Sequence, residues 1–124
     1  MDEAEEHLAH VDGVMLGRAA YHDPAILGAV DRRLFDEGRD VCAAEAVAGY
    51  LPYVRAELAR GTHLAAMTRH MLGLFHGQPG ARAWRRILTV EGARAGAGIE
   101  VIERGLAALA EAAAPRRCIR LAAG

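Results

Sequence analysis

Apolar residues recur at the spacing of an α-helix along most of this chain. The stripe is clearest between residues 43 and 60, where one face carries Val47, Leu51, Val54 and Leu58. It returns between residues 62 and 75, with Leu64, Met67, Met71 and Phe75 in phase. Apolar positions three and four residues apart form one face of a helix, so both stretches are predicted to be amphipathic helices.

Turn and capping residues mark the ends of the predicted helices. Asp23-Pro24 is typical of an N-cap followed by proline at the first helical position, which predicts a helix from there to residue 35. Gly61 is expected to end one helix and Thr62 to cap the next. Further helices are predicted over residues 2–10, 81–88 and 99–113, with Pro115 ending the last one.

One short apolar run interrupts this helical pattern. Residues 11–16, VDGVML, are mainly apolar and stop at Gly17, which is typical of a buried strand. No second strand is predicted, and a lone strand leaves its backbone N–H and C=O groups without partners. Either the strand belongs to a sheet whose other strands lie outside this chain, or the segment is not a strand here.

The two halves of the chain differ in charge, although the net charge is only −1. Residues 1–50 contain four Arg and eleven acidic residues, whereas residues 51–124 contain eleven Arg and five Glu. A basic second half favours an anionic partner, although such an asymmetry can also be incidental. Every basic residue is Arg, whose planar guanidinium suits phosphate groups.

The isolated cysteines and the composition of the N-terminus indicate the cellular compartment of the protein. Cys42 and Cys118 have no Cys neighbours, so no zinc spacing or redox pair is present. Reduced thiols and a cytoplasmic location are expected. The acidic N-terminus is unlike a signal peptide, and no run of about 18 apolar residues predicts a membrane span. His70 and His76 lack an acidic companion, so no metal site is predicted.

Gly17-Arg18 is a candidate phosphate contact. A glycine after the predicted strand lets a phosphate approach the backbone, and the N–H groups at the following helix start attract anions. Arg18 would add a positive charge. The alternative is an ordinary strand-to-helix turn, because Gly-Arg is a common pair.

The helix predicted at residues 81–88 is a second candidate. Its residues Arg82, Arg85 and Arg86 lie at i, i+3 and i+4 and therefore share one face. Trp84 falls on the opposite, apolar side and is predicted to pack in the core rather than to stack on a base. The arginine face is a candidate platform for RNA phosphates. The alternative is a solvated arginine face that binds no ligand.

Three segments of the chain resemble one enzyme family. Residues 11–24, VDGVMLGRAAYHDP, are similar to the end of the flavin-binding barrel in tRNA-dihydrouridine synthases. Residues 68–75, TRHMLGLF, and residues 77–86, GQPGARAWRR, resemble the helical domain of the A subfamily. The match keeps a consistent order over residues 6–109. It departs at residues 89–93, where TVEGA replaces a Ser-Glu-Asn-Ala-like run.

The resemblance implies an enzyme that reduces uridine at position 20 or 20a of the tRNA D-loop, with FMN carrying the hydride and NADPH supplying it. Gly17 and Arg18 match the family's FMN phosphate-binding pair. The family's catalytic cysteine lies on an earlier barrel loop that has no counterpart here, so no catalytic residue is assigned. The residues expected to contact tRNA are Arg82, Arg85, Arg86 and Arg69.

Under this resemblance the fold class is mainly α, a small helical bundle preceded by one strand left over from a truncated (β/α)8 barrel. The expected division is the end of the flavin-binding barrel at residues 1–35, a linker at 36–41, a helical tRNA-binding domain at 42–113 and a disordered tail at 114–124.

Such a barrel needs about 250 residues, so the chain alone is expected to be inactive. It is expected to be a truncated gene product or one piece of a split protein, with the missing barrel portion as a candidate partner chain. The alternatives are a stand-alone, non-catalytic RNA-binding helical module and an inactive gene remnant.

Overall fold

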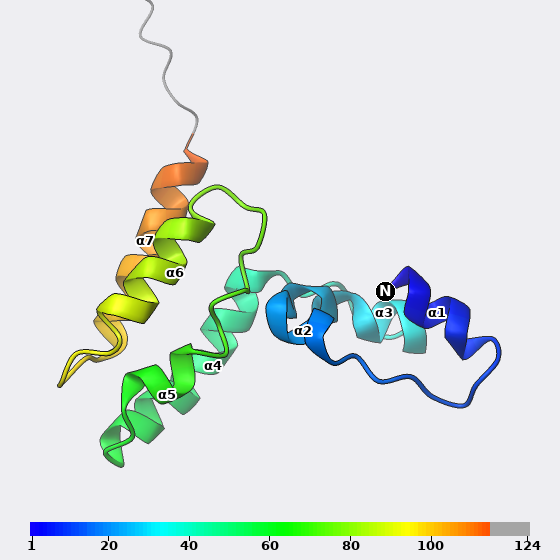
Figure 1. Cartoon of the computed structure of the whole chain (residues 1–124), viewed down its shortest axis with the longest axis horizontal. Coiled ribbons are helices and arrows are strands. Elements are labelled where there is room, and N and C mark those ends of the chain that lie inside the picture. The colour runs from blue at the N-terminus through cyan, green and yellow to red at the C-terminus, as the bar shows by residue number, and fades with distance from the viewer. Residues whose placement is uncertain (115–124) are drawn as a thin grey trace, which may run out of the picture.

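Helices joined by turns and loops make up residues 1–114, the part of the protein that this computed structural model describes (Figure 1). In chain order they are α1 (Asp2–Leu8), α2 (Arg18–His22), the 3-10 helix η1 (Pro24–Ala29), α3 (Val30–Phe35), α4 (Ala43–Ala59), α5 (Leu64–Thr68), α6 (Ala81–Val90) and α7 (Ile99–Ala113). Pro115 and Cys118 lie outside the described residues, so the predicted tail stays a prediction.

The helices form two groups. The helices α1, α2, η1 and α3 lie together at one end of the molecule, and α4 to α7 lie at the other (Figure 1). We refer to residues 1–41 as the N-terminal segment and to residues 42–114 as the helical body.

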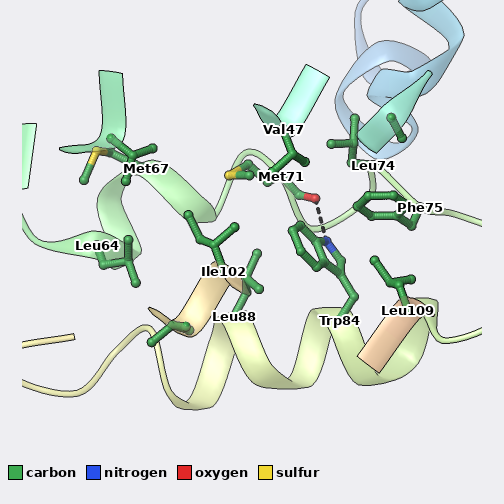
Figure 2. Close-up of a cluster of buried hydrophobic side chains, with 13 residues drawn as sticks. Val47, Leu64, Met67, Met71, Leu74, Phe75, Trp84, Leu88, Ile102 and Leu109 are labelled. Atoms are coloured by element: carbon green, nitrogen blue, oxygen red, sulfur yellow. Dashed lines mark hydrogen bonds between the residues drawn. The ribbon is translucent and has the colours of Figure 1, made fainter. Parts of the chain in front are cut away.

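The helical body is organised around Trp84 of α6, whose side chain is fully buried (Figure 2). Its indole Nε1 donates a hydrogen bond of 3.0 Å to the carbonyl oxygen of Met71. Phe75 meets the indole edge to face, with ring centroids 4.9 Å apart. α7 comes close because Gly105 has no side chain, and a Cβ there would lie 2.7 Å from Cε3 of Trp84. The prediction that Trp84 packs in the core is confirmed.

The longer helices follow the apolar pattern of the sequence. The helices predicted at residues 43–60, 81–88 and 99–113 are confirmed as α4, α6 and α7, with ends shifted by at most two residues. Apolar positions recur every three to four residues in α6, so Trp84 and Leu88 turn inward while the arginines face solvent. Each large apolar side chain buried in this way stabilises the fold by about 1.5–3 kcal/mol.

The strand predicted at residues 11–16 is wrong, because no strand occurs in residues 1–114. The segment is an irregular loop between α1 and α2 (Figure 1), in which Val11 is 52% and Met15 is 85% exposed. A strand needs a neighbouring strand to pair with its N–H and C=O groups, and the described residues contain none. Over these residues the fold is all-helical.

The helix predicted from residue 62 to residue 75 is wrong beyond Thr68, where α5 ends. The chain continues in tight turns, the first closed by the Met71 N–H, which donates to the Thr68 carbonyl at 2.9 Å. Met71 and Phe75 still reach the core. These turns bring the backbone of Gly73 directly against the N-terminal segment, which is the kind of tertiary contact that overrides local helix propensity.

Two predicted N-cap side chains do not cap their helices. Thr62 donates from Oγ1 to a carboxylate oxygen of Glu57 at 2.9 Å, and α5 begins after His63 without a side-chain cap. Asp23 makes no capping bond either. Pro24 opens a helical stretch as predicted, but this stretch is the 3-10 helix η1, and the α-helix α3 begins only at Val30.

Ion pairs, and no buried apolar core, link the helices of the N-terminal segment to one another. Arg33 of α3 donates from Nε to Glu5 at 2.7 Å and from Nη2 to Asp2, and both carboxylates belong to α1. Within residues 1–41 the only buried apolar side chain is Ala4. Large apolar side chains such as Phe35 remain exposed. This segment therefore offers apolar surface that its own residues do not cover.

Candidate functional site

A cleft of about 540 Å³ lies where the N-terminal segment meets the helical body. Tyr21 and His22, at the end of α2, contribute to its wall from the N-terminal segment. The helical body contributes Arg69, Leu72, Gly73, His76 and Arg85. The cleft therefore joins α2, the turns after α5, and α6, which are far apart in the sequence.

The cleft depends on a close backbone approach at Gly73. A Cβ at this position would lie 1.9 Å from the carbonyl oxygen of His22 and 3.4 Å from Cδ of Pro24. Only glycine permits such an approach. With the end of α2 held in this place, the ring of Tyr21 packs edge-on against His22 and His70, with centroid separations of 6.0 and 6.1 Å.

The cleft carries positive charge and no carboxylate. Arg69 and Arg85 are exposed, and neither forms an ion pair with any acidic residue of the described chain. His22 and His76 add imidazole groups that can donate hydrogen bonds. Other arginines are already paired with carboxylates, namely Arg32, Arg33, Arg39, Arg60 and Arg104. The two unpaired guanidinium groups suit an anion supplied by a bound molecule.

The arginines predicted to contact tRNA do not all gather in one place. Arg69 and Arg85 line the cleft together. Arg82 and Arg86 lie on the exposed surface of α6, outside the cleft lining, and form no ion pair within residues 1–114. α6 therefore presents one arginine to the cleft and two to the surface beside it.

Gly17 and Arg18 lie at the start of α2, the helix whose other end lines the cleft. Both residues are exposed, and Arg18 pairs with no carboxylate of the described chain. The guanidinium and the first N–H groups of α2 are therefore open to an anion. Gly17 also borders a hollow of about 380 Å³ beside α1, but Glu3 lines that hollow and would repel a phosphate.

Several cleft residues were missed by the sequence analysis. Tyr21, His22 and Leu72 were not assigned to a site, and His76 was considered only as a metal ligand. The sequence offered one signal for Tyr21 and His22: they come shortly after Gly17-Arg18, the candidate phosphate contact. Nothing in the sequence indicated the contact at Gly73 that unites them.

In residues 1–114 no three His, Cys, Asp or Glu side chains are grouped to hold a metal ion, and no helix is long and apolar enough to cross a membrane.

A second, apolar hollow of about 300 Å³ lies beside α4. It is lined by Ala46, Val47, Tyr50, His70, Met71 and Leu74. Tyr50 stacks on Tyr53, with ring centroids 5.2 Å apart and an interplanar angle of 27°. Burial, and then the neighbouring Tyr53, raises the pKa of Tyr50 above its ordinary value of 10.0, and the hydroxyl is neutral at physiological pH, as it is in any unperturbed tyrosine. We refer to this hollow as the tyrosine groove.

Comparison with known proteins places these features in a family. Residues 1–112 match the family model described as dihydrouridine synthase (Dus). The tRNA-dihydrouridine(20/20a) synthase of Salmonella typhimurium is 50% identical over 114 residues, which cover 90% of this chain and 34% of that protein. The enzyme of the same name from Escherichia coli (strain K12) is 49% identical over 112 residues, covering 90% of this chain and 32% of that protein.

A more distant relative gives the same result. The tRNA-dihydrouridine(20/20a) synthase of Vibrio cholerae is 47% identical over 108 residues, covering 86% of this chain and 33% of that protein. The chain thus spans about a third of the length of the curated relatives it matches. The resemblance drawn from residues 11–24, 68–75 and 77–86 is confirmed. This chain belongs to the dihydrouridine synthase family.

Proposed function

We propose that this chain supplies the tRNA-binding helical part, and one end of the FMN phosphate site, of a tRNA-dihydrouridine synthase. The reaction would be reduction of uridine at position 20 or 20a of the tRNA D-loop in the cytoplasm. The observation that carries the proposal is the carboxylate-free cleft in which Arg69 and Arg85 lie unpaired with any described acidic residue.

Charge and geometry favour RNA phosphates as the ligand of this cleft. Each guanidinium can donate two parallel hydrogen bonds to one phosphate. Arg82 and Arg86 extend the positive surface along α6. An RNA backbone, with its regularly spaced phosphates, could therefore contact both the cleft and the surface of α6. Contacts of this kind supply much of the affinity of proteins for nucleic acids and weaken as salt rises.

The contact with FMN is proposed for Gly17 and Arg18. Arg18 and the first amides of α2 fit a phosphate, because both are exposed and no described carboxylate competes for Arg18. When bound, FMN supplies the hydride for the uracil ring and receives it from NADPH. In this proposal residues 1–35 complete the flavin-binding barrel and residues 42–113 bind tRNA. The exposed apolar side chains of the N-terminal segment, such as Met15 and Phe35, support this division, because barrel contacts would cover them.

Binding of tRNA is tested with a gel-shift titration of the full chain at several salt concentrations. The double variant Arg69→Gln/Arg85→Gln should weaken binding by about 10-fold or more and reduce the slope of log affinity against log salt by up to about two. The control is Arg55→Gln/Arg94→Gln, which removes two exposed arginines that do not line the cleft. If both double variants bind tRNA equally well, the cleft is not the RNA site.

Catalysis is tested separately. The chain spans about a third of its relatives' length, and the resemblance assigns none of its residues to the family's catalytic cysteine loop, so we expect no NADPH oxidation with tRNA and no retained flavin absorbance. Adding the remaining barrel as a second chain should restore dihydrouridine formation. Flavin retention and NADPH oxidation by the chain alone would overturn this part of the proposal.

A further inference from the structure

The cleft and the tyrosine groove meet at one pair of rings. Tyr21 lines the cleft, and His70 lines the groove. Their ring centroids lie 6.1 Å apart in an edge-to-face arrangement. Arg69, which lines the cleft, is the direct neighbour of His70 in the chain. A ligand that extends past this ring pair would contact guanidinium groups on one side and an aromatic groove on the other.

The groove differs chemically from the cleft. Val47 and Met71 form a buried apolar floor, and Tyr50 presents part of a neutral aromatic ring. No Arg, Asp or Glu lines it. Its volume of about 300 Å³ lies at the lower end of the range for small-ligand pockets. The groove therefore suits a flat, uncharged group.

We propose that the tyrosine groove is the stacking site for one unpaired base of the RNA whose phosphates lie in the neighbouring cleft. The inference rests on the proposed RNA function and adds a base contact to it. Single-stranded parts of RNA are recognised by stacking of unpaired bases on aromatic side chains while arginines hold the backbone. A wholly apolar ligand would suit the groove but would leave Arg69 and Arg85 without an anion, whereas RNA supplies both groups.

Variants of Tyr50 test the stacking contact by tRNA gel shift. Tyr50→Leu keeps an apolar side chain but removes the ring, and should weaken binding by about 5- to 100-fold. The slope of log affinity against log salt should not change, because no phosphate contact is lost. Tyr50→Phe should bind like the wild-type chain. Phe35→Leu is the matched control and should bind like the wild-type chain, because it removes an exposed ring that lines neither the groove nor the cleft.

Each outcome of these variants bears on the proposal. Wild-type affinity in Tyr50→Leu would overturn it. Equal weakening in Tyr50→Phe and Tyr50→Leu would also overturn it, because the hydroxyl rather than the ring would then matter. Circular dichroism melting of each variant shows whether Tyr50→Leu is folded at the temperature of the gel shift.

A titration of the wild-type chain, followed by NMR, needs no variant. Uridine 5′-monophosphate and inorganic phosphate are added in parallel. Both should shift the side-chain signals of Arg69 and Arg85, but only the nucleotide should shift the amides of Ala46 and Tyr50. Identical shifts with the two ligands would overturn the base site while leaving the phosphate cleft intact. Groove shifts without arginine shifts would support the base site and count against the cleft.

Discussion

The N-terminal segment and the helical body are stabilised in different ways. In the helical body, buried apolar side chains from α4 to α7 and the turns between them form one core cluster, which includes Trp84 (Figure 2). The N-terminal segment buries only Ala4 among its apolar residues and relies on the ion pairs of Arg33. Several of its larger apolar side chains, Met15 and Phe35 among them, face solvent.

This difference indicates which part is able to fold alone. Apolar burial is the main driving force of folding, whereas exposed ion pairs contribute little. The helical body therefore has the means to stay folded by itself, while the N-terminal segment depends on surfaces beyond its own residues. The docking at Gly73 is one such surface, and the cleft forms along it.

Removing the indole ring of Trp84 should destabilise the whole helical body. Trp84→Ala deletes the largest fully buried side chain and leaves the Met71 carbonyl without its donor. We expect a loss of about 3–5 kcal/mol in the free energy of unfolding, measured by urea denaturation followed by circular dichroism. Val90→Ala, at an exposed position of the same helix, should change stability by less than about 0.5 kcal/mol. Similar values for the two variants would show that Trp84 is not the centre of the core.

A methyl group at position 73 should separate the two regions while leaving the core folded. In Gly73→Ala the new Cβ would lie 1.9 Å from the His22 carbonyl oxygen, so one of the two backbones has to move. We expect a loss of about 1–3 kcal/mol. Hydrogen-exchange protection should fall in α2 and η1 but persist in α6 and α7.

A second glycine serves as the control for this substitution. Gly49 lies inside α4, and nothing within 4 Å would meet a Cβ there. Gly49→Ala should therefore stabilise the chain by about 0.5–1 kcal/mol, because alanine favours a helix interior. Unchanged protection of α2 in Gly73→Ala would contradict the proposed role of this contact.

The smallest effect on stability is expected for the ion pair between Arg39 and Glu45, which links the N-terminal segment to the helical body. Hydrogen bonds from Arg39, and then from the Cys42 N–H, lower the pKa of Glu45 from 4.5 to about 2. A lowered pKa means that the folded state favours the charged carboxylate. The stabilisation is therefore present above pH 4.5 and is lost as the pH falls towards 2.

Thermal melts measure this contribution. Wild-type chain should melt slightly above Glu45→Gln at pH 6, and the difference should vanish by pH 2. Glu103→Gln is the control, because Glu103 is exposed on α7 and forms no ion pair within residues 1–114. A difference between wild type and Glu45→Gln that does not depend on pH would argue against a charged role for Glu45.

Sequence reasoning succeeded where an element depends mainly on its own residues. The apolar stripes of α4, α6 and α7 located these helices, and the position of Trp84 on the apolar side of α6 predicted its burial. Sequence reasoning failed where contacts with another segment of the chain decide the structure. Residues 11–16 have the composition of a strand, but residues 1–114 contain no second strand to pair with them. Residues 69–75 continue the helical spacing, yet the packing of Gly73 against His22 accompanies a path of turns.

The candidate site shows the same division. Arg69, Arg82, Arg85 and Arg86 were named from spacing and from resemblance to a family, and that family is now shown by the match over residues 1–112. Spacing along one helix could not show that Arg69 and Arg85 share a cleft with Tyr21 and His22, because these residues belong to three separate segments.

The sequence by itself determined the family, the longer helices and the residue types available for binding an anion, because motifs and apolar periodicity are local properties of a chain. The tertiary structure alone decided that residues 11–16 form a loop, which arginines meet in a cleft, and that an aromatic groove lies beside them. The loop follows from the lack of a pairing strand in residues 1–114. The cleft and the groove depend on contacts between distant segments, above all the approach of His22 to Gly73, and no local pattern encodes such a contact.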